Sequence, residues 1–137
     1  MSGSFVWRGQ AQRDLPLPFE YQMKDNPIRE KSYAFALAIV RFTRELSQKR
    51  EHVLSKQLLR AGTSIGANVE EGVVGQSRRD FISKMSIARK EAFECNYWLR
   101  LVRDAGLTSP RRVQPLIDES DALGKMLTAI VKSAQEK

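Results

Sequence analysis

The stretch that decides the fold is residues 77–106, which read SRRDFISKMSIARKEAFECNYWLRLVRDAG. Ser77, three residues before Asp80, is a typical helix N-cap, and Gly106 is a typical residue at a helix end. Between them, apolar residues recur at alternating steps of four and three, the spacing of one face of an α-helix. The stretch therefore predicts a long amphipathic helix, with a buried face made of Phe81, Met85, Ala88, Ala92, Cys95, Leu99 and Val102.

The same periodicity predicts two helices before this stretch. One covers residues 27–49 and begins at Asn26, an N-cap that is followed by a proline at the first helical position. The other covers residues 53–73 and ends at Gly72 and Gly75. Its apolar face is Leu54, Leu58, Ala61 and Ile65.

A fourth helix follows residue 106 and starts either at Ser109-Pro110 or at Pro115. Four amphipathic helices with short connections, and no strand signal, predict an all-α fold: an antiparallel up-and-down four-helix bundle over residues 27–137. Residues 1–26 contain two prolines and two glycines and predict an N-terminal arm that is extended or disordered. The apolar positions of the fourth helix are Leu116, Leu123, Leu127 and Ile130.

The chemistry available to this chain of 137 residues is limited. A single Cys95 excludes a disulfide framework, and a single His52 excludes metal sites that need two imidazoles. Three acidic pairs suggest a di-metal centre, but such bundles use Glu-x-x-His pairs, which are missing here. We expect no metal, no cofactor and no enzyme activity, because no nucleophile can be paired with a base. The acidic pairs are Glu70-Glu71, Glu91 with Glu94, and Asp118-Glu119.

Neither a targeting segment nor an apolar run of about 20 residues is visible, so we expect a cytoplasmic protein that does not enter a membrane. The first helix has two apolar stripes, one more than a bundle core requires. A helix that is apolar on two faces indicates a homo-oligomer, and the alternative is an unusually wide monomer core. One stripe is Phe35, Ile39, Phe42 and Leu46, and the other is Tyr33, Ala36, Leu37 and Val40.

Small residues interrupt the second helix at Gly62 and Gly66, which favours close approach of a neighbouring helix over two tolerated glycines on a solvent face. The same helix closes with carboxylates, which oppose the helix dipole and need basic partners. We expect a structural polar network in which Asn68, Glu70 and Glu71 are partnered by Arg60, Arg89 or Lys90, with Glu91 and Glu94 from the third helix.

The chain carries a formal net charge of +7 and has a pI near 9.9. This charge favours contact with nucleic acid, although the surface of a bundle is often simply solvated. Basic residues are most frequent on the first and third helices. The predicted nucleic-acid-binding residues are Arg41, Arg44, Lys49, Arg50, Arg78, Arg79, Lys84 and Arg89.

Three motifs point to a known family. The longest is VLSKQLLRAGTSIGANVEEG at residues 53–72, and the others are SRRDF at 77–81 and KEAFECNYWL at 90–99. Together they resemble the bacterial four-helix bundle protein family, which includes proteins encoded in intervening sequences of large-subunit ribosomal RNA genes. The sequence is also similar to the accessory variability determinant protein of diversity-generating retroelements. The resemblance covers residues 28–131.

The resemblance implies an antiparallel four-helix bundle that assembles as a homopentamer with a central channel and has no enzyme activity. In the retroelement relative, a basic barrel binds a reverse transcriptase and nucleic acid, and the intervening-sequence members are suspected of RNA association. The family offers no catalytic residues to carry over. Its motif positions look structural in this chain: Arg60, Ser64, Asn68, Glu70 and Glu91.

Two functions are therefore expected. In the first, a homopentamer binds nucleic acid, most plausibly structured RNA, by contacting phosphates without reading bases. In the second, the protein is an interaction scaffold, for example an accessory subunit of a reverse transcriptase, and its charge only steers a protein partner. RNA crosslinking distinguishes the first from the second.

Overall fold

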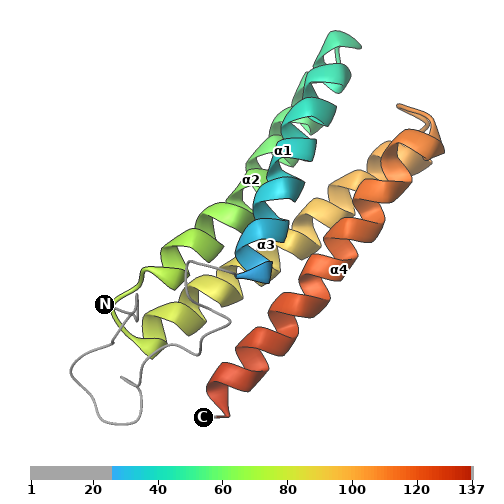
Figure 1. Ribbon diagram of the computed structural model, residues 1–137. Helices are drawn as coiled ribbons and strands as arrows, with labels where there is room; N and C mark the ends of the chain where they lie inside the picture. Colours follow the sequence, from blue (N-terminus) through green and yellow to red (C-terminus); the bar gives the residue numbers. More distant parts are fainter. Residues whose placement is uncertain (1–25, 137) are drawn as a thin grey trace.

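The computed structural model describes residues 26–136, and these form four α-helices and no strand. The helices are α1 (Pro27–Gln48), α2 (His52–Val73), α3 (Arg78–Asp104) and α4 (Pro110–Gln135). They run up and down in sequence order, so each helix lies antiparallel to the next (Figure 1). The predicted antiparallel four-helix bundle is confirmed, whereas the predicted arm falls, except for Asn26, outside the described residues.

The helix starts follow the capping signals in the sequence. The Asn26 side chain accepts a hydrogen bond from the backbone N–H of Arg29, and the Ser77 hydroxyl accepts one from the N–H of Asp80 at 3.1 Å. These bonds satisfy N–H groups that have no partner inside the helix. After α3, Gly106 adopts a φ of 71°, which a residue without a Cβ tolerates best.

The start of α4, which the sequence left open, is at Ser109-Pro110. Pro115 therefore lies inside the helix, where it cannot donate a hydrogen bond to the carbonyl of Arg111. The missing hydrogen bond is tolerated because Pro115 is only the sixth residue of the helix. In addition, Val113 in the first turns is fully buried and holds this part of the helix in place.

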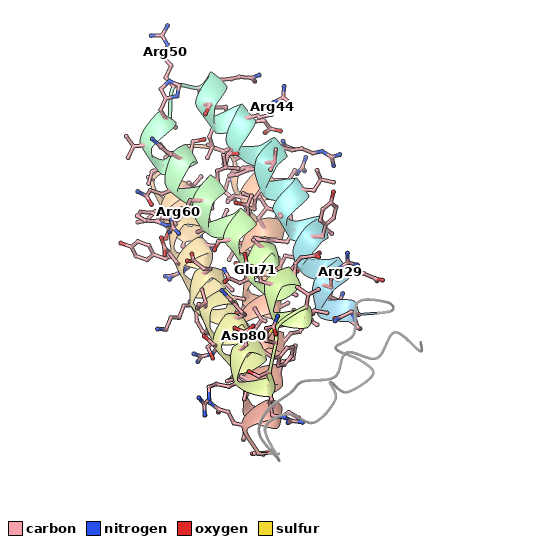
Figure 2. The ribbon with its side chains drawn as sticks, turned by 90° about the vertical axis from the view of Figure 1, so that its left-hand side faces the viewer. Arg29, Arg44, Arg50, Arg60, Glu71 and Asp80 are labelled. Carbon is pink, nitrogen blue, oxygen red and sulfur yellow. The ribbon has the colours of Figure 1, made fainter. Side chains whose placement is uncertain are left out.

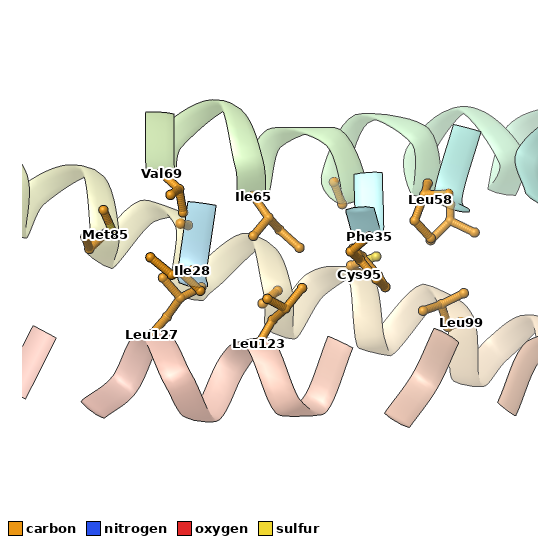
Figure 3. Packing of buried hydrophobic residues seen from close by; sticks show 14 of the residues in the cluster. Ile28, Phe35, Leu58, Ile65, Val69, Met85, Cys95, Leu99, Leu123 and Leu127 are labelled. Atoms are coloured by element: carbon orange, nitrogen blue, oxygen red, sulfur yellow. The ribbon is translucent and has the colours of Figure 1, made fainter. Parts of the chain in front are cut away.

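The core is one apolar cluster that runs the length of the bundle, with all four helices contributing (Figure 3). On α1, the stripe containing Phe35 and Ile39 faces inward and is at most 4% exposed. The second stripe faces outward, since Tyr33, Leu37 and Val40 are 66%, 40% and 37% exposed. The two stripes predicted from the sequence thus have different environments, and the outer one lacks a partner within residues 26–136.

The predicted close approach of two helices is present between α1 and α2. A Cβ added to Gly62 would lie 2.8 Å from two atoms of Ile39, and one added to Gly66 would lie 3.3 Å from the carbonyl oxygen of Ser32. Both distances are shorter than ordinary van der Waals contact. Gly62 and Gly66 lie on the buried face of α2 that packs against α1. Because they have no side chain, the two helices can approach this closely.

We expect Gly62→Ala to destabilise the protein by about 1 kcal/mol, although alanine normally stabilises a helix by about that amount. The reason is overpacking, since Ile39 is β-branched, fully buried and unable to move away. The matched control is Gly124→Ala, where the nearest side chain is the half-exposed Phe93 at 3.3 Å. Because Phe93 can shift, this control should be neutral or stabilising by up to about 1 kcal/mol. Urea denaturation measures both, and equal effects would contradict the close approach.

Candidate nucleic-acid interface

Positive charge is concentrated at one end of the bundle, where α1 and α3 end and α2 and α4 begin. Figure 2 labels two of its residues, Arg44 and Arg50. The two segments that form it, residues 41–56 and 100–112, carry nine Lys or Arg and three Asp or Glu. This end therefore contributes +6 of the net charge of +7. We refer to it as the basic end, made of Arg41, Arg44, Lys49, Arg50, Lys56, Arg100, Arg103, Arg111 and Arg112.

Within residues 26–136, most cations of the basic end have no carboxylate partner. Two are paired: Arg112 forms an ion pair with Glu45, and Arg103 pairs with Asp104 at 2.8 Å. Arg100 donates a hydrogen bond to the amide oxygen of Asn96. The other six form no ion pair within residues 26–136, so they can contact an external anion. They are Arg41, Arg44, Lys49, Arg50, Lys56 and Arg111.

The two ends of the bundle also differ in how their helix N-termini are capped. At the opposite end, α1 and α3 are capped by side chains and carry Glu30 and Asp80 in their first turns, which offset the positive helix dipoles. At the basic end, Glu51 and Ser109 form no side-chain cap, and the first turns of α2 and α4 contain no acidic residue. Because α1 and α3 end here, the negative ends of their dipoles offset the positive ends of α2 and α4, so the positive potential of the basic end comes from its side chains.

The structure separates the eight predicted binding residues into two groups. Four of them belong to the basic end and are exposed: Arg41, Arg44, Lys49 and Arg50. The other four lie on the first three turns of α3, which begins at the opposite end of the bundle: Arg78, Arg79, Lys84 and Arg89.

Three of the α3 residues are engaged within the chain. Arg78 is only 8% exposed and donates a hydrogen bond to the carbonyl of Ala134, where it holds the last turn of α4. Lys84 pairs with Glu71 at 3.0 Å. Arg89 donates to the hydroxyl of Thr128 at 2.7 Å and lies over the ring of Phe93. Arg79 is exposed, but the α3 group does not form one surface with the basic end.

Sequence reasoning missed the basic residues Lys56, Arg100, Arg103, Arg111 and Arg112 because it grouped charges by helix. In an antiparallel bundle, the last residues of one helix lie at the same end of the bundle as the first residues of the next, so their charges add up there. Counting charge around each connection would have identified the basic end.

The expected polar network exists with different partners. Arg60 pairs with Glu91 at 3.2 Å and with Glu94, and the indole N–H of Trp98 donates to Glu94 at 3.1 Å. This cluster joins α2 to α3. The hydrogen bond from Trp98, followed by the guanidinium of Arg60, lowers the pKa of Glu94.

The partners predicted for the acids that close α2 were wrong. Glu70 pairs with Arg29 of α1 at 3.0 Å, and Glu71 pairs with Lys84 of α3. Arg60 lies about three turns away from these acids along α2, which explains why it binds α3 instead. Asn68 donates a hydrogen bond within its own helix, to the carbonyl of Ser64.

The lowered pKa of Glu94 predicts a pH dependence of stability. Because the pKa is lower in the folded state, the carboxylate stabilises the fold above its unfolded pKa of about 4.3, and this contribution is lost as pH falls through the folded value. We expect the free energy of unfolding to fall less steeply between about pH 5 and pH 3 in Glu94→Gln than in the unaltered protein. Urea denaturation across this range measures it, with Glu119→Gln on the exposed side of α4 as the control. Identical pH slopes for Glu94→Gln and the unaltered protein would contradict the role of this cluster.

Catalytic or metal-binding groups do not gather elsewhere in the described chain. Cys95 lies in the core, where burial raises the pKa of its thiol and keeps it neutral. Residues 26–136 contain no group of three or more His, Cys, Asp or Glu that could hold a metal ion. None of the helices in this range is long and apolar enough to cross a membrane.

Comparison with known proteins identifies the family. The family model of the 23S rRNA-intervening sequence protein matches residues 24–129, which is most of the chain. The chain belongs to this family. The resemblance inferred from the three sequence motifs is thereby confirmed, and the match includes all of the basic end.

A solved structure supports the assignment of the fold. It is the crystal structure of a protein of unknown function from the S23 ribosomal protein family of Bacteroides thetaiotaomicron. That protein is 42% identical to this chain and has a TM-score of 0.75, with 80% of this chain and 99% of that chain covered. No curated protein matches this chain.

Proposed function

We propose that this protein is a non-enzymatic homo-oligomer that binds structured RNA through phosphate contacts at the basic end. The observation that carries the proposal is the concentration of +6 of the net charge there, on nine cations of which seven form no ion pair within residues 26–136. Phosphate contacts are individually modest and add up when many cations share one surface. RNA is favoured over DNA because the family is named for an intervening sequence of ribosomal RNA.

The oligomer in this proposal is a pentamer, as the family resemblance implies. Its support in the described residues is the outer stripe of α1 together with exposed apolar residues on α3, namely Tyr97 and Leu101, which are 48% and 38% exposed. Large exposed apolar groups of this kind are typical of protein contacts. Five copies would multiply the field of the basic end. The proposal places the protein in the cytoplasm, which suits its unpaired thiol.

Nuclease-treated protein titrated into a fluorescent structured RNA at low salt tests the proposal. We expect the anisotropy to rise with submicromolar affinity. If no RNA binds even at low salt, the proposal fails, and the interaction scaffold with a protein partner such as a reverse transcriptase becomes the function to pursue. Light scattering tests the assembly, which should weigh five times 15.6 kDa. A mass of one chain would contradict it.

A further inference from the structure

A groove of about 490 Å³ lies between α1 and α4 at the basic end. The groove exists because α1 and α4 pack less closely than the other three neighbouring pairs of helices. Its volume falls in the range of roughly 300–1,000 Å³ that small-molecule sites in proteins occupy. The lining residues are Ala38, Arg41, Phe42 and Glu45 of α1, and Arg111, Arg112, Pro115 and Leu116 of α4.

The groove combines two kinds of surface. Its rim is basic, with Arg41 on one helix and Arg111 on the other, and neither forms an ion pair within residues 26–136. Arg112 is tied to Glu45 across the groove, so the only acid in the lining is already neutralised. The remaining lining is apolar or nearly so: Ala38, Phe42, Pro115 and Leu116.

Two further grooves among the described residues lack this combination. The one between α1 and α2 is lined by Arg44, His52 and Lys56 with Ser, Thr and Gln side chains, and Leu59 is its one apolar residue. This groove could bind a phosphate, but it has little apolar surface against which a base could pack. The groove lined by Arg29, Glu30, Tyr33 and Glu70 is acidic overall, because Arg29 pairs with Glu70 and the charge of Glu30 is left to repel a phosphate.

We infer that the α1–α4 groove holds an unpaired nucleotide of the bound RNA, with its base against Pro115 and Leu116 and its phosphate between Arg41 and Arg111. A nucleotide has the matching chemistry, since it joins a flat, weakly polar base to an anion. In a continuous duplex the faces of the bases are stacked on one another and cannot reach a protein surface. The inference rests on the proposed function and adds a preference for RNA with unpaired nucleotides.

Two RNA hairpins of equal length and charge, each closed by a non-nucleotide linker so that neither has an unpaired loop, test this preference by fluorescence anisotropy. One has a continuous stem, and the other has a bulge of unpaired uridines. We expect the bulged hairpin to bind about tenfold more tightly, because removing roughly 55 Å² of apolar surface from water is enough for that factor. If both hairpins bind equally, the inference is overturned while the proposed function stands. If neither binds, both fail.

A pair of variants on one helix separates the groove from general charge. Arg41→Ala and Arg44→Ala each remove one exposed, unpaired cation from α1, but only Arg41 lines this groove. We expect Arg41→Ala to reduce the preference for the bulge to less than about twofold. Arg44→Ala should weaken both hairpins by the same factor and keep the preference. An equal loss of preference in the two variants would overturn the inference.

Crosslinking gives a readout that does not depend on affinity. With 4-thiouridine in the bulge, we expect irradiation to attach the RNA to peptides containing residues 38–45 or 111–116. Attachment only to other peptides would overturn the placement of the nucleotide in this groove.

Discussion

Reversing three charges at the basic end is expected to weaken RNA binding by at least about 100-fold. The variant is Arg44→Glu with Lys49→Glu and Lys56→Glu, all exposed residues without ion pairs in the described structure. It removes three phosphate contacts and adds three repulsive charges, which affects every RNA sequence alike. Fluorescence anisotropy at fixed salt measures the loss, and circular dichroism checks that the helices remain.

A variant with the same change in net charge controls for total charge. Arg79→Glu, Lys90→Glu and Lys132→Glu lie on exposed positions of α3 and α4 outside the basic end. We expect this control to lose less than about tenfold in affinity, since only long-range attraction is reduced. Equal losses in the two triple variants would show that net charge alone, and not the basic end, determines binding.

Truncating the inner stripe of α1 is expected to have the largest effect on stability. Phe35 is 2% exposed and lies in the centre of the core, so Phe35→Ala should reduce the free energy of unfolding by about 3–5 kcal/mol. Urea denaturation followed by circular dichroism measures it. A loss below about 1 kcal/mol would contradict the assignment of this stripe to the core.

The outer stripe should respond differently. Leu37, two residues along the same helix, is 40% exposed and contacts solvent in a single chain. We expect Leu37→Asp to leave the helical circular dichroism signal unchanged and to lower the mass measured by light scattering. An unchanged mass together with an unchanged fold would show that this stripe is not part of the contact between subunits.

The fold could be predicted closely because its signals are local. Asn26 and Ser77 mark helix starts through hydrogen bonds to N–H groups three residues away, and periodicity identifies the buried face of each helix. The start of α4 could not be chosen, because Pro110 and Pro115 are both acceptable first residues of a helix. Packing against residues distant in sequence favours Pro110, because Val113 in the first turn of the helix is fully buried in the core.

The candidate site was only half predictable. Arg41 and Arg44 were identified from composition, but the burial of Arg78 was not, because a long basic side chain can reach a carbonyl on another helix. Its partner, Ala134, lies 56 residues away. Likewise, the groove between α1 and α4 depends on how closely two helices pack, and periodicity within either helix contains no information about that distance.

The salt dependence of RNA affinity tests the central claim most directly. If Arg41, Arg44, Lys49, Arg50, Lys56 and Arg111 of one protomer contact the phosphates of a double-stranded stem, a plot of log affinity against log salt concentration should fall with a slope of about −5, at roughly 0.9 per contact. Anisotropy titrations of nuclease-treated protein between low and physiological salt give this slope. A steep slope near this value is the predicted result. A slope near zero, or no binding at the lowest salt, would contradict a phosphate-binding role for the basic end.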